Sequence, residues 1–380
     1  MLRILYTHLM TYWLLWGAFF VLVMTSFAST TILSNSRILV MILILSFGFI
    51  RRYNKNSNSI PLYAYLFPLY VVIVGLNETD NISQLISLSF TVFFWMLLFR
   101  QINSMSVDAD SLKYISVIMS ICCNILALLY IYVVVPAIDS MEVESQRVAA
   151  VNSIYLVLGF LPFVFILRTW IWHYLFSIIP VFAMVVSAKS TCLLCLVTIS
   201  IFYIYKMLTF LRLNSLFFLI SLFVIFIALL LNPIIVNKII SVIKVDIETG
   251  GSGRLDIYKQ VIILFNNSDW FNIFLGHGVD SISRTIGIGG HNDILEVLFC
   301  YGILGFILFC MMLYYFVSLK MKGRYCKMVY SISLIVLFYN IFFSKMFVTQ
   351  LGLIPFALCA GALSAFSHGK NNSSLKISQY

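Results

Sequence analysis

The chain alternates long apolar runs with short polar connections, and this pattern predicts a bundle of membrane-spanning helices. A spanning helix needs about 20 mostly apolar residues to cross the hydrocarbon layer of a bilayer. Twelve runs of this kind occur, at residues 9–27, 32–50, 60–76, 82–99, 114–137, 151–167, 170–187, 191–207, 214–235, 294–318, 328–343 and 347–366. The connections around Arg168 and Lys189 are very short, so we expect the helices on either side of each to form antiparallel hairpins.

Composition narrows the fold class further. Of the 380 residues, 62% are apolar and 10% are charged, and the mean hydropathy is +1.03. Soluble globular proteins carry about 45–50% apolar and roughly 25% charged residues, so a soluble enzyme, a secreted disulfide scaffold and a disordered chain are all excluded. A membrane β-barrel would show alternating segments of roughly ten residues. We therefore predict an all-α polytopic membrane protein in which residues 1–380 form a single membrane domain.

The distribution of Lys and Arg predicts which side of the membrane each connection faces. With the N-terminus in the cytoplasm, the cytoplasmic connections hold fifteen Lys and Arg residues and the short outer loops hold four. This asymmetry agrees with the positive-inside rule and places both termini in the cytoplasm. The net charge of +10 is explained by this topology and by contact with anionic membrane lipid. Nucleic acid is therefore not expected as a partner.

One connection is much longer than the others and faces outward: residues 236–293. Loops of this length without an obvious domain of their own are usually functional, so we expect the chemistry here. Within it, Gly250, Gly251 and Gly253 precede Arg254. Backbone N–H groups of such a segment can converge on an anion, and arginine adds a bidentate fork suited to phosphate. The alternative is a flexible glycine linker that ends in a solvated arginine.

A helix is predicted to begin at the end of this loop. Asp293 and Glu296 have the spacing of a capping box, and Asn292 is an alternative N-cap. His291 then stands just before a helix N-terminus at the outer face of the membrane. The positive end of the helix disfavours imidazolium and favours the neutral ring that a general base needs. The alternative is a boundary histidine with no catalytic role.

Two further cations, Arg147 and Lys189, lie in predicted outer connections. Lys189 is in a turn at bilayer depth, where a lysine is costly unless it snorkels or has a partner. Arg147 follows Glu142 and Glu144, and either carboxylate could pair with it. Together with Arg254, these residues predict a set of cations contributed by separate helix pairs on one side of the membrane.

The cysteines favour packing over chemistry. Cys192 and Cys195 have the spacing of a redox or metal pair, but they lie in apolar sequence that offers no further ligands. Buried cysteine behaves as a small apolar residue. We therefore predict no metal site.

Four segments resemble the bacterial superfamily that contains O-antigen polymerases (Wzy type) and O-antigen ligases (WaaL type). They are residues 147–152, residues 187–190, a Gly-Arg-Leu-Asp segment at 253–256 followed by Gly-His-Gly at 276–278, and residues 291–305, which read His-Asn-x-x-Leu-Glu and then Tyr-Gly-x-x-Gly. The last two lie within residues 253–305, about a seventh of the chain. One departure concerns the short turn, which usually carries arginine in that superfamily and carries Lys189 here, a point charge in place of a fork.

The resemblance implies a GT-C-like, metal-independent, inverting glycosyltransferase that needs no cofactor. Its donor and acceptor would be oligosaccharides on undecaprenyl diphosphate, and its active site would face the periplasm from the bacterial inner membrane. The site residues that it implies are a catalytic base (His291), three cations for the diphosphate (Arg147, Lys189 and Arg254) and supporting residues (Gly253, Asn292 and Glu296). A separate chain-length regulator protein is also implied by the family.

Three activities remain open at this level. A polymerase extends one lipid-linked repeat unit with another, whereas a ligase transfers the finished chain to the lipid A core. We favour the polymerase, because the divergence of this chain outside the motifs suits an enzyme that matches one strain's repeat. The third is a flippase for the same lipid-linked sugar. Transporters usually show internal repeats and broken helices at mid-bilayer, and the two halves of this sequence show no convincing repeat.

Overall fold

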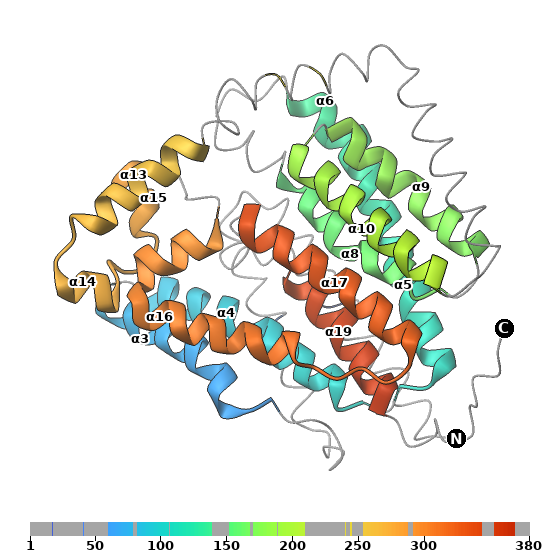
Figure 1. Ribbon diagram of the computed structural model, residues 1–380, viewed down its shortest axis with the longest axis horizontal. Coiled ribbons are helices and arrows are strands. Elements are labelled where there is room, and N and C mark those ends of the chain that lie inside the picture. Colours follow the sequence, from blue (N-terminus) through green and yellow to red (C-terminus); the bar gives the residue numbers. More distant parts are fainter. Residues whose placement is uncertain are drawn as a thin grey trace.

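The computed structural model describes nine segments of the chain, and all of the regular structure within them is helical (Figure 1). The segments are residues 60–78, 82–105, 107–138, 152–167, 170–187, 189–209, 254–287, 292–343 and 353–368, together with the single positions 17, 41, 240 and 244. The predicted spans at 9–27, 32–50 and 214–235 fall outside these segments. Each of the other nine predicted spans overlaps a helix.

The helices follow one another in the described segments with short connections. In chain order they are η1 (Leu62–Tyr65), α3 (Leu66–Glu78), α4 (Ile82–Asn103), α5 (Ala109–Leu129), η2 (Tyr130–Val134), α6 (Val135–Ile138), α8 (Ile154–Val164), α9 (Trp170–Ser187), α10 (Ser190–Thr209), α13 (Arg254–Asn266), α14 (Trp270–Leu275), α15 (Ser281–Ile286), α16 (Asp293–Val317), α17 (Arg324–Phe343) and α19 (Leu353–His368). The element η1 is a 3₁₀ turn that leads into α3, and η2 is a π-helical turn between α5 and α6.

Three helices in the described part of the chain are long and apolar enough to cross a membrane. They are Ala109–Ala137, which runs from α5 through η2 into α6, Asp293–Val317 and Arg324–Phe343. Shorter apolar helical stretches are Leu62–Leu76, Ile154–Val164, Leu175–Ser187, Ser190–Lys206 and Leu353–His368. Helix α8 has 11 residues where the sequence predicted a span over 151–167, and at about 1.5 Å per residue it is roughly 16 Å long. The molecule is thus a helical protein of membrane character.

Helix α19 lies at the centre of the bundle. It packs against α4, α8 and α17, and nearly all of its side chains are buried. Much of the helix consists of small residues, which allow neighbouring backbones to approach closely. At Gly361 an added Cβ would lie 3.1 Å from Ile102 Cβ of α4. An alanine there would require Ile102 or the neighbouring backbone to shift by a few tenths of an ångström.

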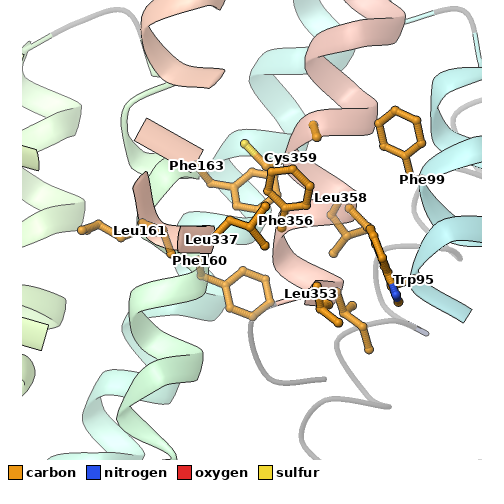
Figure 2. Packing of buried hydrophobic residues seen from close by; sticks show 14 of the residues in the cluster. Trp95, Phe99, Phe160, Leu161, Phe163, Leu337, Leu353, Phe356, Leu358 and Cys359 are labelled. Atoms are coloured by element: carbon orange, nitrogen blue, oxygen red, sulfur yellow. The ribbon is translucent and has the colours of Figure 1, made fainter. Parts of the chain in front are cut away.

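Aromatic side chains fill the space around α19. Figure 2 shows Trp95 and Phe99 of α4, Phe160 of α8 and Phe356 of α19 in this core. Phe316 of α16 joins them, with its ring centroid 5.0 Å from that of Trp95 and 5.6 Å from that of Phe356. Rings at these separations add to the free energy of burial by about 0.5–1.5 kcal/mol per pair.

The helices of the long loop form a second, smaller cluster. Figure 1 shows α13, α14 and α15 beside the first part of α16, on the other side of the molecule from α5, α9 and α10. Val261 of α13, Ile282 of α15, and Phe299 and Cys300 of α16 are buried together. Residues 254–287, which the sequence assigned to the large periplasmic loop at 236–293, are therefore a folded helical unit that packs on α16.

Helix α16 is broken at Gly302, whereas the sequence predicted an uninterrupted span over residues 294–318. Gly302 has φ 66° and ψ −171°, a conformation that is essentially restricted to glycine. The loop after α14 crosses α16 at this point. A Cβ at Gly302 would lie 2.4 Å from the carbonyl oxygen of Phe274, and one at Gly276 would lie 2.3 Å from that of Cys300. Both glycines are required by this close approach.

Backbone hydrogen bonds hold the crossing together. The N–H of His277 donates to the carbonyl of Phe299 at 3.0 Å, and the N–H of Gly278 donates to that of Cys300 at 2.8 Å. A helix end leaves its last carbonyls without intrahelical donors, and these two bonds supply donors beside the break. The Gly-His-Gly and Tyr-Gly-x-x-Gly motifs are thus two halves of one structural feature.

Candidate functional site

The turn between α9 and α10 presents Lys189. The Ser187 hydroxyl accepts a hydrogen bond from the Lys189 N–H at 3.3 Å, and the Lys189 carbonyl accepts from the N–H of Leu193 at 3.1 Å. Lys189 therefore immediately precedes α10, whose first residue is Ser190. Because the connection between α9 and α10 is short, as the sequence predicted, the Lys189 side chain stays close to the start of α10.

The Lys189 ammonium is held by residues from the α8 segment. Its Nζ donates to Asn152 Oδ1 at 2.7 Å and lies 5.5 Å from the centroid of the Tyr155 ring. Both of these neighbours are neutral, and they orient the ammonium. The structure thus gives this lysine partners within the protein, where snorkelling was the alternative. Asn152 ends the first segment of the resemblance, but the sequence did not predict its contact with Lys189.

Arg254 reaches the same end of α10 from the long loop. It is the first residue of α13, and its guanidinium donates a long hydrogen bond of 3.4 Å to Thr191 Oγ1, 63 residues away in the chain. Thr191 is buried in the first turn of α10. Lys189 and Arg254 also both act electrostatically on the buried Cys192. The structure therefore brings two of the three predicted cations together.

The local backbone adds to the positive charge of this site. The amino ends of α10 and α13 meet at the Arg254–Thr191 contact, and each helix N-terminus carries roughly half a positive charge. The acidic residue in the first turn of α13, Asp256, lies 3.8 Å from Lys259 in an exposed ion pair. Two side-chain cations and two helix N-termini suit an anion with several oxygen atoms, such as a phosphate or diphosphate.

Two buried tyrosines line the site, and the sequence did not single them out. Tyr155 of α8 interacts with Thr191 and Arg254 in addition to Lys189. Tyr130 lies in the π-helical turn η2 and interacts with Ser187. Single π-turns inside long helices often occur at functional sites. A tyrosine within an apolar run carries no signal of its own, because hydropathy and spacing treat it as another core residue.

The N-terminus of α16 has one of the two caps that the sequence predicted. Asn292 Oδ1 accepts hydrogen bonds from the N–H groups of Ile294 and Leu295 at 2.9 and 3.2 Å, so Asn292 is the N-cap. Glu296 is buried, and its Oε2 lies 3.7 Å from Cys300 Sγ. This part of α16 packs against α13. The predicted site residues Arg147, Gly253 and His291 lie outside the described residues.

A second histidine in the loop, His277, has a structural role. Its Nε2 lies 2.7 Å from Ser268 Oγ, and its Nδ1 lies 3.2 Å from the carbonyl oxygen of Phe299. The ring stacks on Phe299 with a centroid distance of 4.2 Å and an angle of 2° between the planes. Both nitrogens and one face are engaged, so this imidazole locks the segment after α13 onto α16.

Cys192 and Cys195 are buried free thiols among apolar side chains. Within the described segments, no group of three His, Cys, Asp or Glu side chains has an arrangement that could hold a metal ion.

Comparison of the chain with protein-family models, with curated proteins and with solved structures found no match. The function is therefore inferred from the residues of this chain and their arrangement.

Proposed function

We propose that this chain is an O-antigen polymerase, a membrane glycosyltransferase that joins oligosaccharide repeat units carried on undecaprenyl diphosphate. One observation supports this proposal above the others: Lys189 and Arg254, from separate parts of the sequence, meet at the amino ends of α10 and α13. A lipid diphosphate leaving group requires such fixed positive charge. The resemblance of four sequence segments to this superfamily supplies the substrate class.

In the proposed reaction, a hydroxyl of the acceptor sugar attacks the anomeric carbon of the donor with inversion. The bond between that carbon and the diphosphate oxygen breaks, and the lipid diphosphate leaves with both bonding electrons. His291 takes the proton from the attacking hydroxyl as general base. Lys189, Arg254 and Arg147 stabilise the negative charge that develops on the leaving group. Preorganised cations are effective in this role because they need not reorganise during the reaction.

The proposal includes a topology. Twelve helices of a GT-C-like protein cross the bacterial inner membrane, both termini are cytoplasmic, and residues 236–293 lie on the periplasmic side. The asymmetry of Lys and Arg supports this orientation, and nine of the predicted spans overlap helices. The diphosphate-linked donor would enter from the outer leaflet, and a chain-length regulator protein would act beside the polymerase.

The test is expression of the gene in its own strain after deletion of the chromosomal copy. Restoration of a ladder of O-chain lengths supports a polymerase. If the ladder forms without the gene and only its attachment to the lipid A core is restored, the protein is a ligase. If His291→Ala leaves the ladder intact and the variant inserts normally, the chemistry proposed here is wrong and transport of the lipid-linked sugar becomes the better hypothesis.

A further inference from the structure

Large apolar side chains cover the outer surface of the loop helices. Trp270, Phe271 and Phe274 of α14 are 85%, 70% and 51% exposed, and Leu255 and Ile262 of α13 are 53% and 49% exposed. Monomeric soluble surfaces rarely group such residues, and a group of this kind marks contact with a membrane or a partner. The surface formed by Trp270, Phe271 and Phe274 is called the α14 patch below.

The α14 patch adjoins the apolar outer face of two helices. Helix α14 packs on α16, and the Tyr70 hydroxyl of α3 donates to the carbonyl of Leu275, the last residue of α14, at 2.7 Å. Figure 1 shows α14 beside α3 and the bend of α16. Immediately after that bend, Ile303 and Ile307 are exposed on one face of α16. In a helical membrane protein, exposed apolar faces of this kind contact lipid.

The position of Tyr70 along α3 fixes the depth of the α14 patch. Leu69, Ile73 and Leu76 of α3 are each about half exposed and lie on one face of the helix. Ile73 and Leu76 lie beyond Tyr70 by about 5 and 9 Å along the helix axis, at roughly 1.5 Å per residue. The apolar belt of α3 therefore continues past the level at which α14 is attached. The attachment of α14 is therefore level with the apolar part of α3.

We propose that the α14 patch is inserted into the leaflet that surrounds α3 and α16, and that its partner is bilayer lipid. Trp270 lies next to the polar sequence Asn266–Asp269, and tryptophan is favoured where hydrocarbon meets headgroups. Asp269 accepts a hydrogen bond from Asn272 N–H at 2.7 Å and caps α14. In this proposal, part of the segment predicted as a periplasmic loop is a membrane anchor.

The inference does not depend on the proposed reaction and can be tested on the purified full-length chain. The protein is reconstituted into vesicles of phosphatidylcholine and phosphatidylglycerol whose acyl chains are brominated either near the headgroup or near the chain end. Trp270→Phe is compared with the wild type, and the difference in fluorescence reports on Trp270. We expect this component to be quenched most strongly by lipid brominated near the headgroup, and aqueous iodide to leave it almost unchanged.

A matched control is Trp172→Phe, since Trp172 is 44% exposed on the apolar helix α9; its component should also be quenched by brominated lipid. A second reporter, Phe274→Trp in the Trp270→Phe background, should repeat the behaviour of Trp270. Quenching of the Trp270 component by iodide and not by lipid would show a water-exposed patch. Protection from both quenchers would show a protein partner, such as a second copy of the chain. Either result would overturn the proposal.

Discussion

The two cations of the candidate site are held to different degrees. Lys189 donates a hydrogen bond of 2.7 Å to Asn152 and lies over the Tyr155 ring, whereas the hydrogen bond that Arg254 donates to Thr191 is long, at 3.4 Å. A lysine is a point charge, and an arginine offers a planar fork that pairs with two oxygen atoms at once. We therefore assign Lys189 to fixed electrostatic stabilisation and Arg254 to direct engagement of the diphosphate.

This division predicts that Arg254 is sensitive to conservative exchange. Arg254→Ala should lower polymer formation by about 100-fold or more, the cost of losing one preorganised donor to a developing charge. Arg254→Lys should recover little of it, because the bidentate geometry is lost. The measurement is the rate at which repeat units are joined in membranes from the deletion strain. The control is Lys259→Ala on the same helix, an exposed residue whose ion pair with Asp256 is worth little; equal losses in Lys259→Ala and Arg254→Ala would contradict the assignment.

Unlike Arg254, Lys189 should tolerate conservative exchange. Lys189→Arg keeps the charge, the hydrogen bond to Asn152 and the contact with the Tyr155 ring, so we expect near-normal polymer. Lys189→Met keeps the length of the side chain and removes the charge, so the same membrane assay should show a loss of about 100-fold. Strong inactivation by Lys189→Arg in a protein that inserts normally would show that the turn does not act on the diphosphate.

Among individual residues, the sequence singled out the charged residues of the candidate site but not their neutral partners. Lys189 stands out because a cation between two apolar helices is costly, and Arg254 stands out because it follows a glycine-rich segment. Asn152, Thr191 and Tyr155 do not, because a single polar residue in an apolar run has no spacing that names its partner. Their contact depends on how α8, α10 and α13 come together, and that is a property of packing between distant segments.

Among the elements, α16 contains a break that hydropathy averaged over many residues does not detect. Its hydropathy predicted one span from 294 to 318, yet the backbone at Gly302 leaves the helical region. A break needs only one residue, and its apolar neighbours hide it. Gly302 belongs to the Tyr-Gly-x-x-Gly motif, but the motif alone does not show that the loop at Gly276 packs against this glycine. The start of the same helix was predictable, because N-capping is a local property of residues 292–296.

Gly302→Ala should therefore destabilise the protein. The φ of 66° would cost about 1–3 kcal/mol for a residue with a Cβ, and the backbone clash at 2.4 Å adds to it. We expect a clear fall in the thermal unfolding midpoint of the purified protein in detergent. The control is Gly323→Ala, where φ is 83° but no atom lies within 4 Å of the added Cβ. A loss at Gly302 no larger than that at Gly323 would mean that the crossing with α14 is not tightly packed.

In the whole molecule, the loop helices α13, α14 and α15 contact both α16 and α10, which are distant in the sequence. They pack on α16 through the cluster around Val261 and Phe299, while Arg254 at their start reaches α10. Hydropathy predicted the helical class and the positions of nine described helices. It did not indicate that α19 lies among α4, α8 and α17, because every apolar helix offers a similar surface and only the match of small and large residues selects the neighbours.

The break in α16 makes the proposed topology testable at one helix. Residues 303–317 span only about 22 Å at roughly 1.5 Å per residue, so α16 crosses the membrane only if the arm before Gly302 contributes depth. Arg284 precedes α16 in the chain and Lys322 follows it, and both residues are exposed. Arg284→Cys should react with an impermeant maleimide added to intact spheroplasts, and Lys322→Cys should react only after permeabilisation, with the unsubstituted chain as the background from Cys310. Reaction at both positions from outside would mean that α16 enters and leaves on one side, and reaction in the opposite order would reverse the orientation inferred from the positive charges.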